Sequence, residues 1–356
     1  MKARAGRPLF RRTGQLVRQF YAAFVLAALA LCVGAVLGYG HTPSLYGALM
    51  GVEGVAILAL METAESMDNA IVDYGILKTM SPRWQKRYIS WGMPISVLGM
   101  RFLFPVLLVA LVAGLSPWQA ARLAVMEPQR YASIMLGAKD MISAFGGAFL
   151  LLIALNYFLD DDKTHHWLSW LERPAARLGG VSALPVGLTL AVLMLVSRLM
   201  GPGHDPMAFL FWGCGGVAAY ILGKETLVWL IGEPGASRMA AGGGLLTFLY
   251  LEFIDASFSF DGVISAFAIT TDPVVIALGL GVGAMFVRSM TLSMLKTNAL
   301  AEYVYVEHGA FYTIFILSLL MLVSVLVEVP EWVTGLVGIL LIGGAFLASA
   351  VRRPVK

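Results

Sequence analysis

The chain has 356 residues, of which 59% are hydrophobic and 13% are charged. A soluble domain of this length would need far more charge on its surface, so the composition predicts a polytopic helical membrane protein without a sizeable soluble domain. The formal net charge of +3 comes mostly from loop Lys and Arg and gives no indication of a nucleic-acid partner. The two cysteines, Cys32 and Cys214, lie in apolar segments and indicate neither a disulfide framework nor a zinc site.

About ten apolar segments follow a basic tail, each near the roughly 20 residues that a helix needs to cross a bilayer. Residues 1–19 form the tail, which we expect to be cytoplasmic, and the first apolar segment is expected to be retained as a helix, since no signal-peptide cleavage site is evident. The sequence therefore predicts an all-α bundle. The expected spans are 20–40, 46–79, 88–115, 133–158, 181–200, 207–231, 240–270, 274–296, 310–328 and 331–351.

The longest polar stretch, 160–177, divides the chain into a first transmembrane repeat with a cytoplasmic linker, 20–178, and a second repeat, 179–356. Adjacent histidines, His165 and His166, lie in this stretch. We expect a solvated loop rather than a metal site, because acids and histidines in a loop cost little in water.

The distribution of Lys and Arg tests the order of the spans. With the N-terminus inside, roughly eighteen basic residues fall in inner loops and three in outer loops, a strong positive-inside bias. This bias predicts that both termini are cytoplasmic.

The first of two acidic motifs lies in the span 46–79 and contains Glu62, Glu65, Asp68 and Asn69. These four side chains fall within a helical sector of roughly 120°, so they can line one face. An acid at membrane depth costs at least a few kcal/mol and is by default a candidate functional residue. Three acids together need a cation or protons to neutralise them.

The second motif contains Glu252, Asp255, Ser259 and Asp261. A shift of about 193 residues places Glu62 on Asp255, Asp68 on Asp261, Ser66 on Ser259 and Asn69 on Gly262. Because the repeat unit would hold about five spans, an odd number, the two halves are expected to have inverted topology, with a substrate site near the midplane between them. Discontinuous helices are expected at both motifs, since the first span is long and Gly262 weakens the second.

The predicted ligands are carboxylate, amide and hydroxyl oxygens, which suit Mn²⁺, Ca²⁺ and Mg²⁺. The metal-binding candidates are Glu62, Glu65, Asp68, Asn69, Asp255 and Asp261. Supporting or gating roles are expected for Ser66, Ser259, Glu252, Arg101, Arg288 and Asp140. The two arginines are expected to pair with acids, either to lock a closed state or as purely structural ion pairs, and Asp140 is expected to be neutralised by Lys139. Shared protons on the coupled acids are the alternative to a metal.

At Glu62-x5-Asp68-Asn69 and Asp255-x5-Asp261 the sequence resembles the TerC-like integral membrane proteins, and most closely a branch known as a domain of unknown function. The stretches 145–151 and 307–310 look like that branch. The resemblance covers about 44–328 and implies a transporter of the wider LysE-type superfamily in a bacterial inner membrane, with TerC-like members linked to manganese export and tellurium resistance. Gly262 departs from the pattern and implies fewer side-chain ligands in the second motif.

The residues and the resemblance together predict a divalent-cation transporter, most simply for Mn²⁺ efflux. The expected partners are the metal ion, as substrate, and the lipid bilayer. The sequence does not decide whether the protein forms a homodimer. Three alternatives remain: a Ca²⁺/H⁺ or other cation antiporter, an intramembrane metal-dependent hydrolase, and a membrane scaffold linked to tellurite or envelope stress. An enzyme is not expected, since the sequence has no H-E-x-x-H pair and no intramembrane histidine near the acids. The absence of a Walker motif argues against direct use of ATP.

Overall fold

The computed structural model describes residues 9–78, 80–92, 95, 99, 101, 103–160, 163, 165–231, 244–297, 300 and 303–352, and this part of the chain is helical without strands. Some side chains within these ranges, including 256–261, lie outside the description. The α-helices are α1 (Leu9–His41), α2 (Leu45–Glu65), α3 (Met67–Leu77), α4 (Pro82–Arg87), α5 (Phe104–Ala113), α6 (Pro117–Met126), α7 (Pro128–Gly137), α8 (Lys139–Phe158), α9 (Ser169–Arg177), α10 (Leu184–Leu199), α11 (Pro206–Ile231), α13 (Gly244–Ile269), α14 (Pro273–Thr297), α15 (Val306–Val323) and α16 (Glu331–Val351). A π-helical turn, η1 (Tyr88–Gly92), follows α4.

The predicted all-helical membrane fold is confirmed, and the described part of the chain contains fewer candidate spans than the ten that the sequence predicts. Among the described residues, seven helices are long and apolar enough to cross a bilayer, or eight if the pair 105–113 and 117–126, bent by 108°, is one span. Helix α10 has 16 residues, which is about 24 Å and shorter than the roughly 30 Å hydrocarbon core. Helix α13 is long enough but carries three acids.

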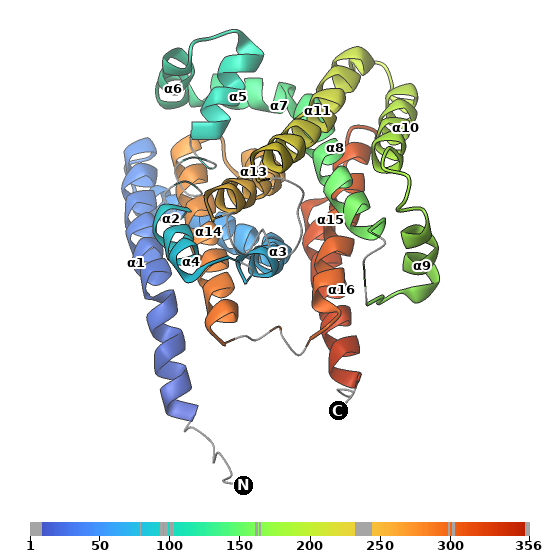
Figure 1. Ribbon diagram of the computed structural model, residues 1–356. Coiled ribbons are helices and arrows are strands. Elements are labelled where there is room, and N and C mark those ends of the chain that lie inside the picture. Colours follow the sequence, from blue (N-terminus) through green and yellow to red (C-terminus); the bar gives the residue numbers. More distant parts are fainter. Residues whose placement is uncertain are drawn as a thin grey trace.

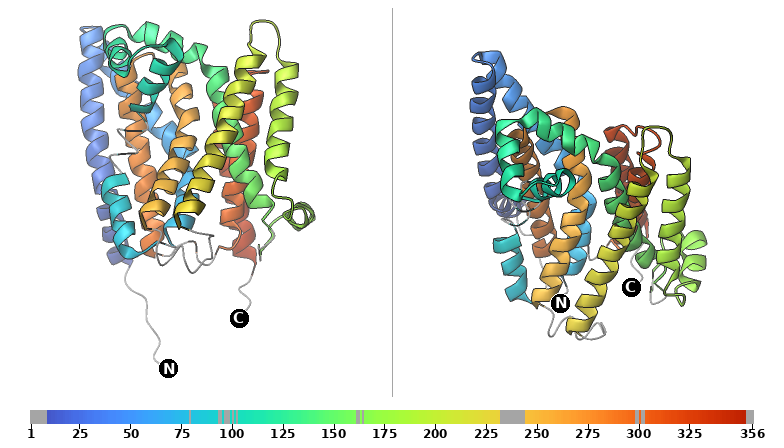
Figure 2. Two further views of the ribbon diagram at one scale, coloured as in Figure 1. Left: turned by 45° about the horizontal axis from the view of Figure 1, so that its top comes forward. Right: turned by 90° about the horizontal axis from the view of Figure 1, so that it is seen from above.

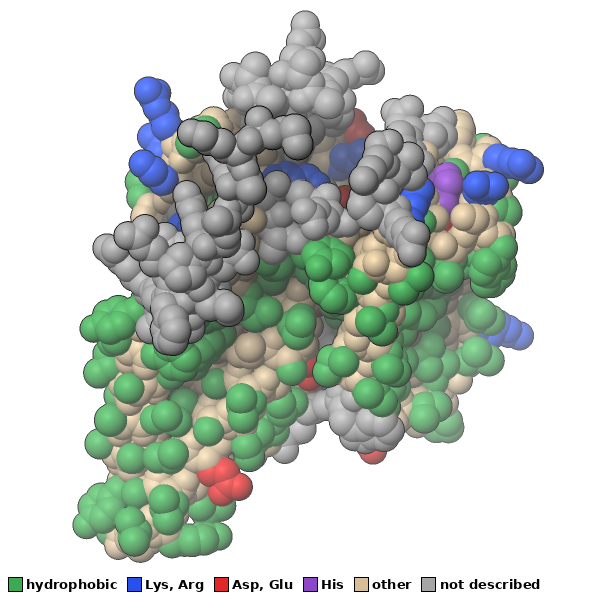
Figure 3. Space-filling model, turned by 90° about the horizontal axis from the view of Figure 1, so that it is seen from below, with side chains coloured by type: hydrophobic (Ala, Val, Ile, Leu, Met, Phe, Trp, Pro, Cys, Tyr) green, Lys and Arg blue, Asp and Glu red, His purple; other side chains and the backbone are tan. Residues whose placement is uncertain are grey.

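The long helices form an upright bundle with α1 at one edge (Figures 1 and 2). The beginning of α1 and the end of α16 lie at the same end of this bundle, and α5 and α6 lie at the opposite end. Figure 3 shows hydrophobic side chains over most of one face, with Lys and Arg gathered mainly along one edge. This arrangement is what a bilayer-embedded wall with a basic rim requires.

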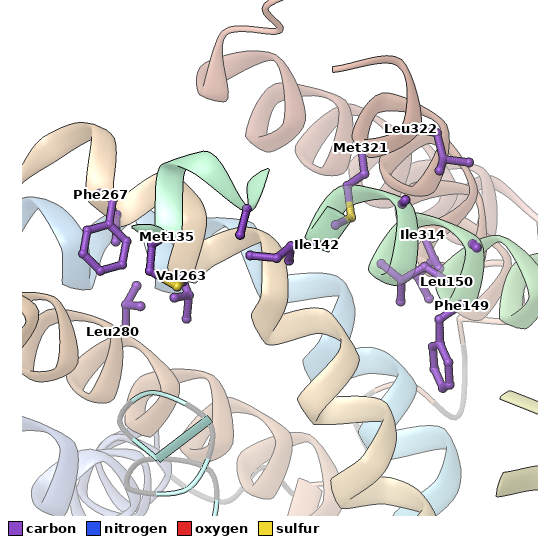
Figure 4. Close-up of a cluster of buried hydrophobic side chains, with 14 of the residues drawn as sticks. Met135, Ile142, Phe149, Leu150, Val263, Phe267, Leu280, Ile314, Met321 and Leu322 are labelled. Atoms are coloured by element: carbon purple, nitrogen blue, oxygen red, sulfur yellow. The ribbon is translucent and has the colours of Figure 1, made fainter. Parts of the chain in front are cut away.

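The apolar core extends from α8, which packs against α11 and α15, to α14, which packs against α2 and α3. Met135, Ile142 and Phe149 from α7 and α8 are buried near Val263 of α13 and Ile314 of α15 (Figure 4). Helices α8 and α14 are the most buried of the candidate spans, whereas α1 and α16 are mostly exposed. The inner helices therefore hold the polar groups described below away from lipid.

Glycines bring α1 and α2 into close contact. A Cβ added at Gly51 would lie 2.0 Å from the carbonyl oxygen of Gly34, and one added at Gly38 would lie 2.1 Å from that of Gly47. Small residues let helix backbones approach closely where lipid supplies no hydrophobic force between helices. Ser44 caps α2 by accepting the N–H of Gly47 at 3.1 Å.

The first acidic motif interrupts its helix, as predicted. Ser66, with φ −90° and ψ 18°, separates α2 from α3. The predicted break in the second motif is wrong, because α13 continues through Gly262. His41, just before α2, lies 3.1 Å from Asp272, just after α13, so these two motif helices run in opposite directions. The inverted repeat as a whole stays a prediction.

The polar stretch 160–177 is not a fully solvated loop, because Glu172 is buried against α15 with 1% exposure. Its Oε1 accepts the N–H groups of Trp167 at 3.2 Å and Leu168 at 3.1 Å, and the hydroxyl of Tyr312 at 3.1 Å. Its Oε2 lies 3.4 Å from His308 Nε2. The carboxylate thus fastens the linker and α9 to α15.

Replacing Glu172 by Ala should destabilise the protein. The change leaves two backbone N–H groups and the Tyr312 hydroxyl buried without their acceptor, and each such group costs about 1–3 kcal/mol. The thermal unfolding midpoint of the detergent-purified protein should fall by several degrees. Glu225→Ala, at an exposed position of α11, is the control and should leave it unchanged. Equal midpoints for the two variants would contradict the anchoring role.

Replacing Gly51 by Val should separate α1 from α2, because a side chain there meets the Gly34 backbone. Such overpacking typically costs about 1–3 kcal/mol. Limited proteolysis should cut the connection between α1 and α2 faster than in the unmodified protein. Gly187→Val is the matched control, since a Cβ there meets no described atom within 4 Å. Unchanged cleavage in Gly51→Val would show that the close approach is not needed.

Candidate functional site

The break between α2 and α3 opens onto a polar pocket. Five residues of the first motif line it, with residues from α13, α15 and α16 opposite. The lining residues are Glu62, Glu65, Ser66, Asp68, Asn69, Gly262, Thr313, Leu317, Leu320, Thr334 and Val337. The centre of a water-sized sphere can move over about 30 Å³, which is room for one or two waters or a small ion. All five predicted residues of the first motif are therefore brought together.

Glu62 is held by an ion pair and by a close glycine. It is 4% exposed, its Oε1 pairs with Arg101, and the same oxygen accepts the Ser66 hydroxyl at 3.1 Å. A Cβ at Gly262 would lie 2.8 Å from Glu62 Oε2, and one at Gly283 would lie 2.5 Å from Glu62 Cβ. Gly262, the departure from the first motif, thus makes room for the carboxylate of the other half.

Asp68 is the acid of this pocket whose charge has the least support. It is 2% exposed. Its Oδ1 accepts the backbone N–H of Asn69 at 2.9 Å, while its Oδ2 has no hydrogen-bond partner among the described residues. Asp68 lies in the first turn of α3, where the helix dipole favours a negative charge by about 0.3–1 kcal/mol. A buried carboxylate with this little compensation favours a bound cation.

Of the second motif, Gly262 lines the pocket, whereas Glu252 and Asp255 lie at a separate ion pair. Arg288 of α14 lies 3.5 Å from Asp255 and 3.3 Å from Glu252, and neither acid lines the pocket. The side chains of Asp261 and Ser259 lie outside the described residues. Among the residues that are described, no three His, Cys, Asp or Glu side chains form a group that could hold a metal ion, so the six-residue ligand set stays a prediction.

Two functional candidates escaped the sequence reasoning. Asp73 of α3 is 2% exposed and accepts the hydroxyl of Tyr88 at 2.7 Å. The Tyr88 ring lies 3.9 Å beneath the Arg288 guanidinium. Asp73 could have been identified from the sequence, because any ionisable residue within a predicted membrane span is a candidate functional residue. Tyr88, one aromatic residue near a span end, gave no such signal.

Asp140 lies apart from both acidic motifs. Its Oδ2 is 2.6 Å from His204 Nδ1, between the start of α8 and the connection before α11. We expected Lys139 to neutralise the Asp140 carboxylate, whereas the structure places His204 against it. Asp140 does not line the pocket at the α2–α3 break.

Two further hollows lie along α3 and α16, and the one against α16 shares Glu65, Asp68 and Thr334 with the pocket. A groove against α16 is lined by Glu65 and Asp68 together with Thr334, Gly338 and Phe346.

The other hollow, of about 320 Å³, begins at Ile71, three residues after Asp68 on α3. It reaches Lys78, whose Nζ lies 3.9 Å from Glu307 of α15. Asp68 is thus near open space along α3 and beside α16.

Comparison with known proteins identifies one family. Residues 67–355 match the family described as "protein of unknown function (DUF475)". The matched range starts directly after Ser66 and includes Asp68, Asn69 and the whole second motif. No curated protein and no solved structure matches the chain. The expected branch of unknown function is thus borne out, while the wider TerC-like and LysE-type assignment stays a prediction. This multi-pass helical membrane protein belongs to the DUF475 family.

Proposed function

We propose that the protein transports a divalent metal cation across a bacterial inner membrane, with Mn²⁺ as the first candidate and efflux as the direction. The observation that carries the proposal is the buried Asp68 carboxylate. Its Oδ2 has no hydrogen-bond partner in the described part of the chain, and Asp68 lines a polar pocket. Glu65 lines the same pocket. Glu62 is matched by Arg101, so its charge does not need the ion.

The chemistry of the pocket favours a hard cation. Carboxylate, amide and hydroxyl oxygens surround the space, and these suit Mn²⁺, Mg²⁺ and Ca²⁺ over softer metals. A transported Mg²⁺-like ion keeps part of its water shell and needs only one or two carboxylates. Asp68 and Glu65 would supply these. Ca²⁺ and Mg²⁺ remain rival substrates of the same site.

Transport, rather than a fixed structural ion, is supported by the surroundings of Asp68. The interrupted helix at Ser66 is the kind of element that lines substrate sites in transporters. Open space follows on α3 from Ile71 to Lys78, and a groove leads along α16. The common end of the two termini, together with the basic residues of the inner loops, supports cytoplasmic termini.

Replacing Asp68 by Asn should abolish export with little change in shape. Cells that lack the protein should retain excess manganese, and the unmodified gene should restore efflux. Asp68→Asn should not restore it, because the variant removes the negative charge that balances the ion. The measurement is cellular manganese after a manganese load. Glu225→Gln, at an exposed position of α11, is the control. Efflux at the normal rate by Asp68→Asn, at equal amounts in the membrane, would refute the proposal.

The identity of the ion can be tested on the purified protein. Mg²⁺ and Ca²⁺ should each compete with Mn²⁺ for binding at equilibrium. The dissociation constants of the three ions then give the order in which the site prefers them. Asp68→Asn should weaken Mn²⁺ binding by at least about tenfold, the loss expected when about 1.4 kcal/mol of ion–carboxylate interaction is removed. Binding that is equal in both proteins would place the ion elsewhere.

A further inference from the structure

A second buried polar cluster lies on another side of α3. It consists of Asp73 of α3, Tyr88 of η1, Glu252 and Asp255 of α13, and Arg288 of α14. Asp73, Glu252 and Arg288 are 2%, 5% and 4% exposed. None of the five lines the pocket that holds Asp68.

The contacts divide the three acids into two kinds. Arg288 Nη2 lies 3.3 Å from Glu252 Oε1 and 3.5 Å from Asp255 Oδ2, so both α13 acids share one guanidinium. Asp73 instead accepts a hydrogen bond from the neutral hydroxyl of Tyr88 at 2.7 Å. No ion pair links Asp73 to a cation among the described residues, and its Oδ1 has no hydrogen-bond partner there.

The local backbone is built around this cluster. Tyr88 and Gly92 belong to one π-helical turn, an irregularity that is frequent at functional sites. A Cβ at Gly92 would lie 2.3 Å from Glu252 Oε1 and 2.9 Å from Arg288 Nη2. The same turn thus supplies the Tyr88 hydroxyl and leaves room for the ion pair.

The charges of the cluster do not balance. Arg101, the other buried arginine described, attracts Glu252 and Asp255 as well as its partner Glu62. With Glu62 and Arg101 included, four carboxyl groups face two guanidiniums. An unpaired carboxylate buried in a helical bundle costs several kcal/mol. Glu252 Oε2 is, like Asp73 Oδ1, without a described partner. At least one further positive charge is needed, and the described neighbours on α3, η1, α13 and α14 do not supply it.

We propose that Asp73 is the site of the coupling proton of this transporter, an inference that rests on the proposed function. The proton forms an O–H bond at Oδ1 while Oδ2 keeps the hydrogen bond from Tyr88. Glu252 and Asp255 are less suited, because both contact Arg288. When the proton leaves to water, the cluster gains a negative charge that Arg288 cannot fully compensate.

Helix α3 connects the two sites. Asp68 and Asp73 lie five residues apart, which places them about 140° apart around the helix, one facing the metal pocket and the other facing Tyr88. Helix α14, which carries Arg288, is joined to α3 by a hydrogen bond from Thr291 to the carbonyl oxygen of Ala70 at 3.4 Å. Loading Asp73 with a proton and loading Asp68 with a metal therefore act on the same short helix.

The first test detects the proton without any metal. Infrared difference spectra between neutral and alkaline pH should contain the C=O stretching band of a buried protonated carboxyl group in the unmodified protein. Asp73→Asn should remove this band, whereas Asp68→Asn, which alters the metal site, should keep it. Persistence of the band in Asp73→Asn would overturn the proposal. Should that variant fail to fold, Tyr88→Phe takes its place: loss of the donated hydrogen bond should shift the band, and an unshifted band would overturn the proposal.

The second test measures coupling in liposomes. With unmodified protein, a pH gradient should drive Mn²⁺ against its own gradient, and a pH-sensitive dye should report protons moving the other way. Asp73→Asn should still bind Mn²⁺ but lose both effects. Gradient-driven accumulation by this variant would refute the role of Asp73. Absence of Mn²⁺ binding by the unmodified protein would instead refute the proposed function and leave the infrared result standing.

Discussion

The cost of burying carboxylates inside an apolar helical bundle governs this structure. The chain keeps Glu62, Asp68, Asp73 and Glu252 at 5% exposure or less, and two arginines lie among them. Arg101 pairs with Glu62 and Arg288 pairs with Glu252. Since breaking a buried pair leaves an uncompensated buried charge, each pair holds together the two segments that carry it. The acids left without such a partner are then the groups able to bind something from outside.

The two acidic motifs meet these demands in a similar way. In each, a glutamate pairs with the arginine of a following segment, Glu62 with Arg101 and Glu252 with Arg288. A glycine near the other motif approaches each carboxylate, Gly262 at Glu62 and Gly92 at Glu252. The motifs differ where function is proposed, because the first motif breaks its helix and its acids line the pocket.

The sequence predicted the helical membrane fold but not the partners of the buried acids. The free-energy cost of burying a group follows from its residue type, whereas its partners depend on how the helices pack. Apolar runs and intramembrane acids identified the spans and Asp68, since both follow from residue type alone. Helical periodicity placed Asp255 on the same helix face as Glu252. It could not predict that Arg288 of α14 would pack against that face. Glu172 was misjudged for the same reason, because its burial comes from α15, which lies more than a hundred residues further along the chain. Tyr88 matters only through the fold that brings it to Asp73.

Helix α3 is where these constraints combine. Its eleven residues begin at the break beside Glu62, carry Asp68 toward the pocket, and present Asp73 to Tyr88. A helix this short gains little stability from its own hydrogen bonds, so its position is set by what surrounds it: α14, α15 and the charges at its two acids. Eight of the eleven residues are buried, and α3 packs against α14 and α15, so a change of charge at either acid acts directly on those contacts. The interruption at Ser66 separates this response from α2. The break therefore makes α3 the element that links the occupancy of the site to the packing of α14 and α15.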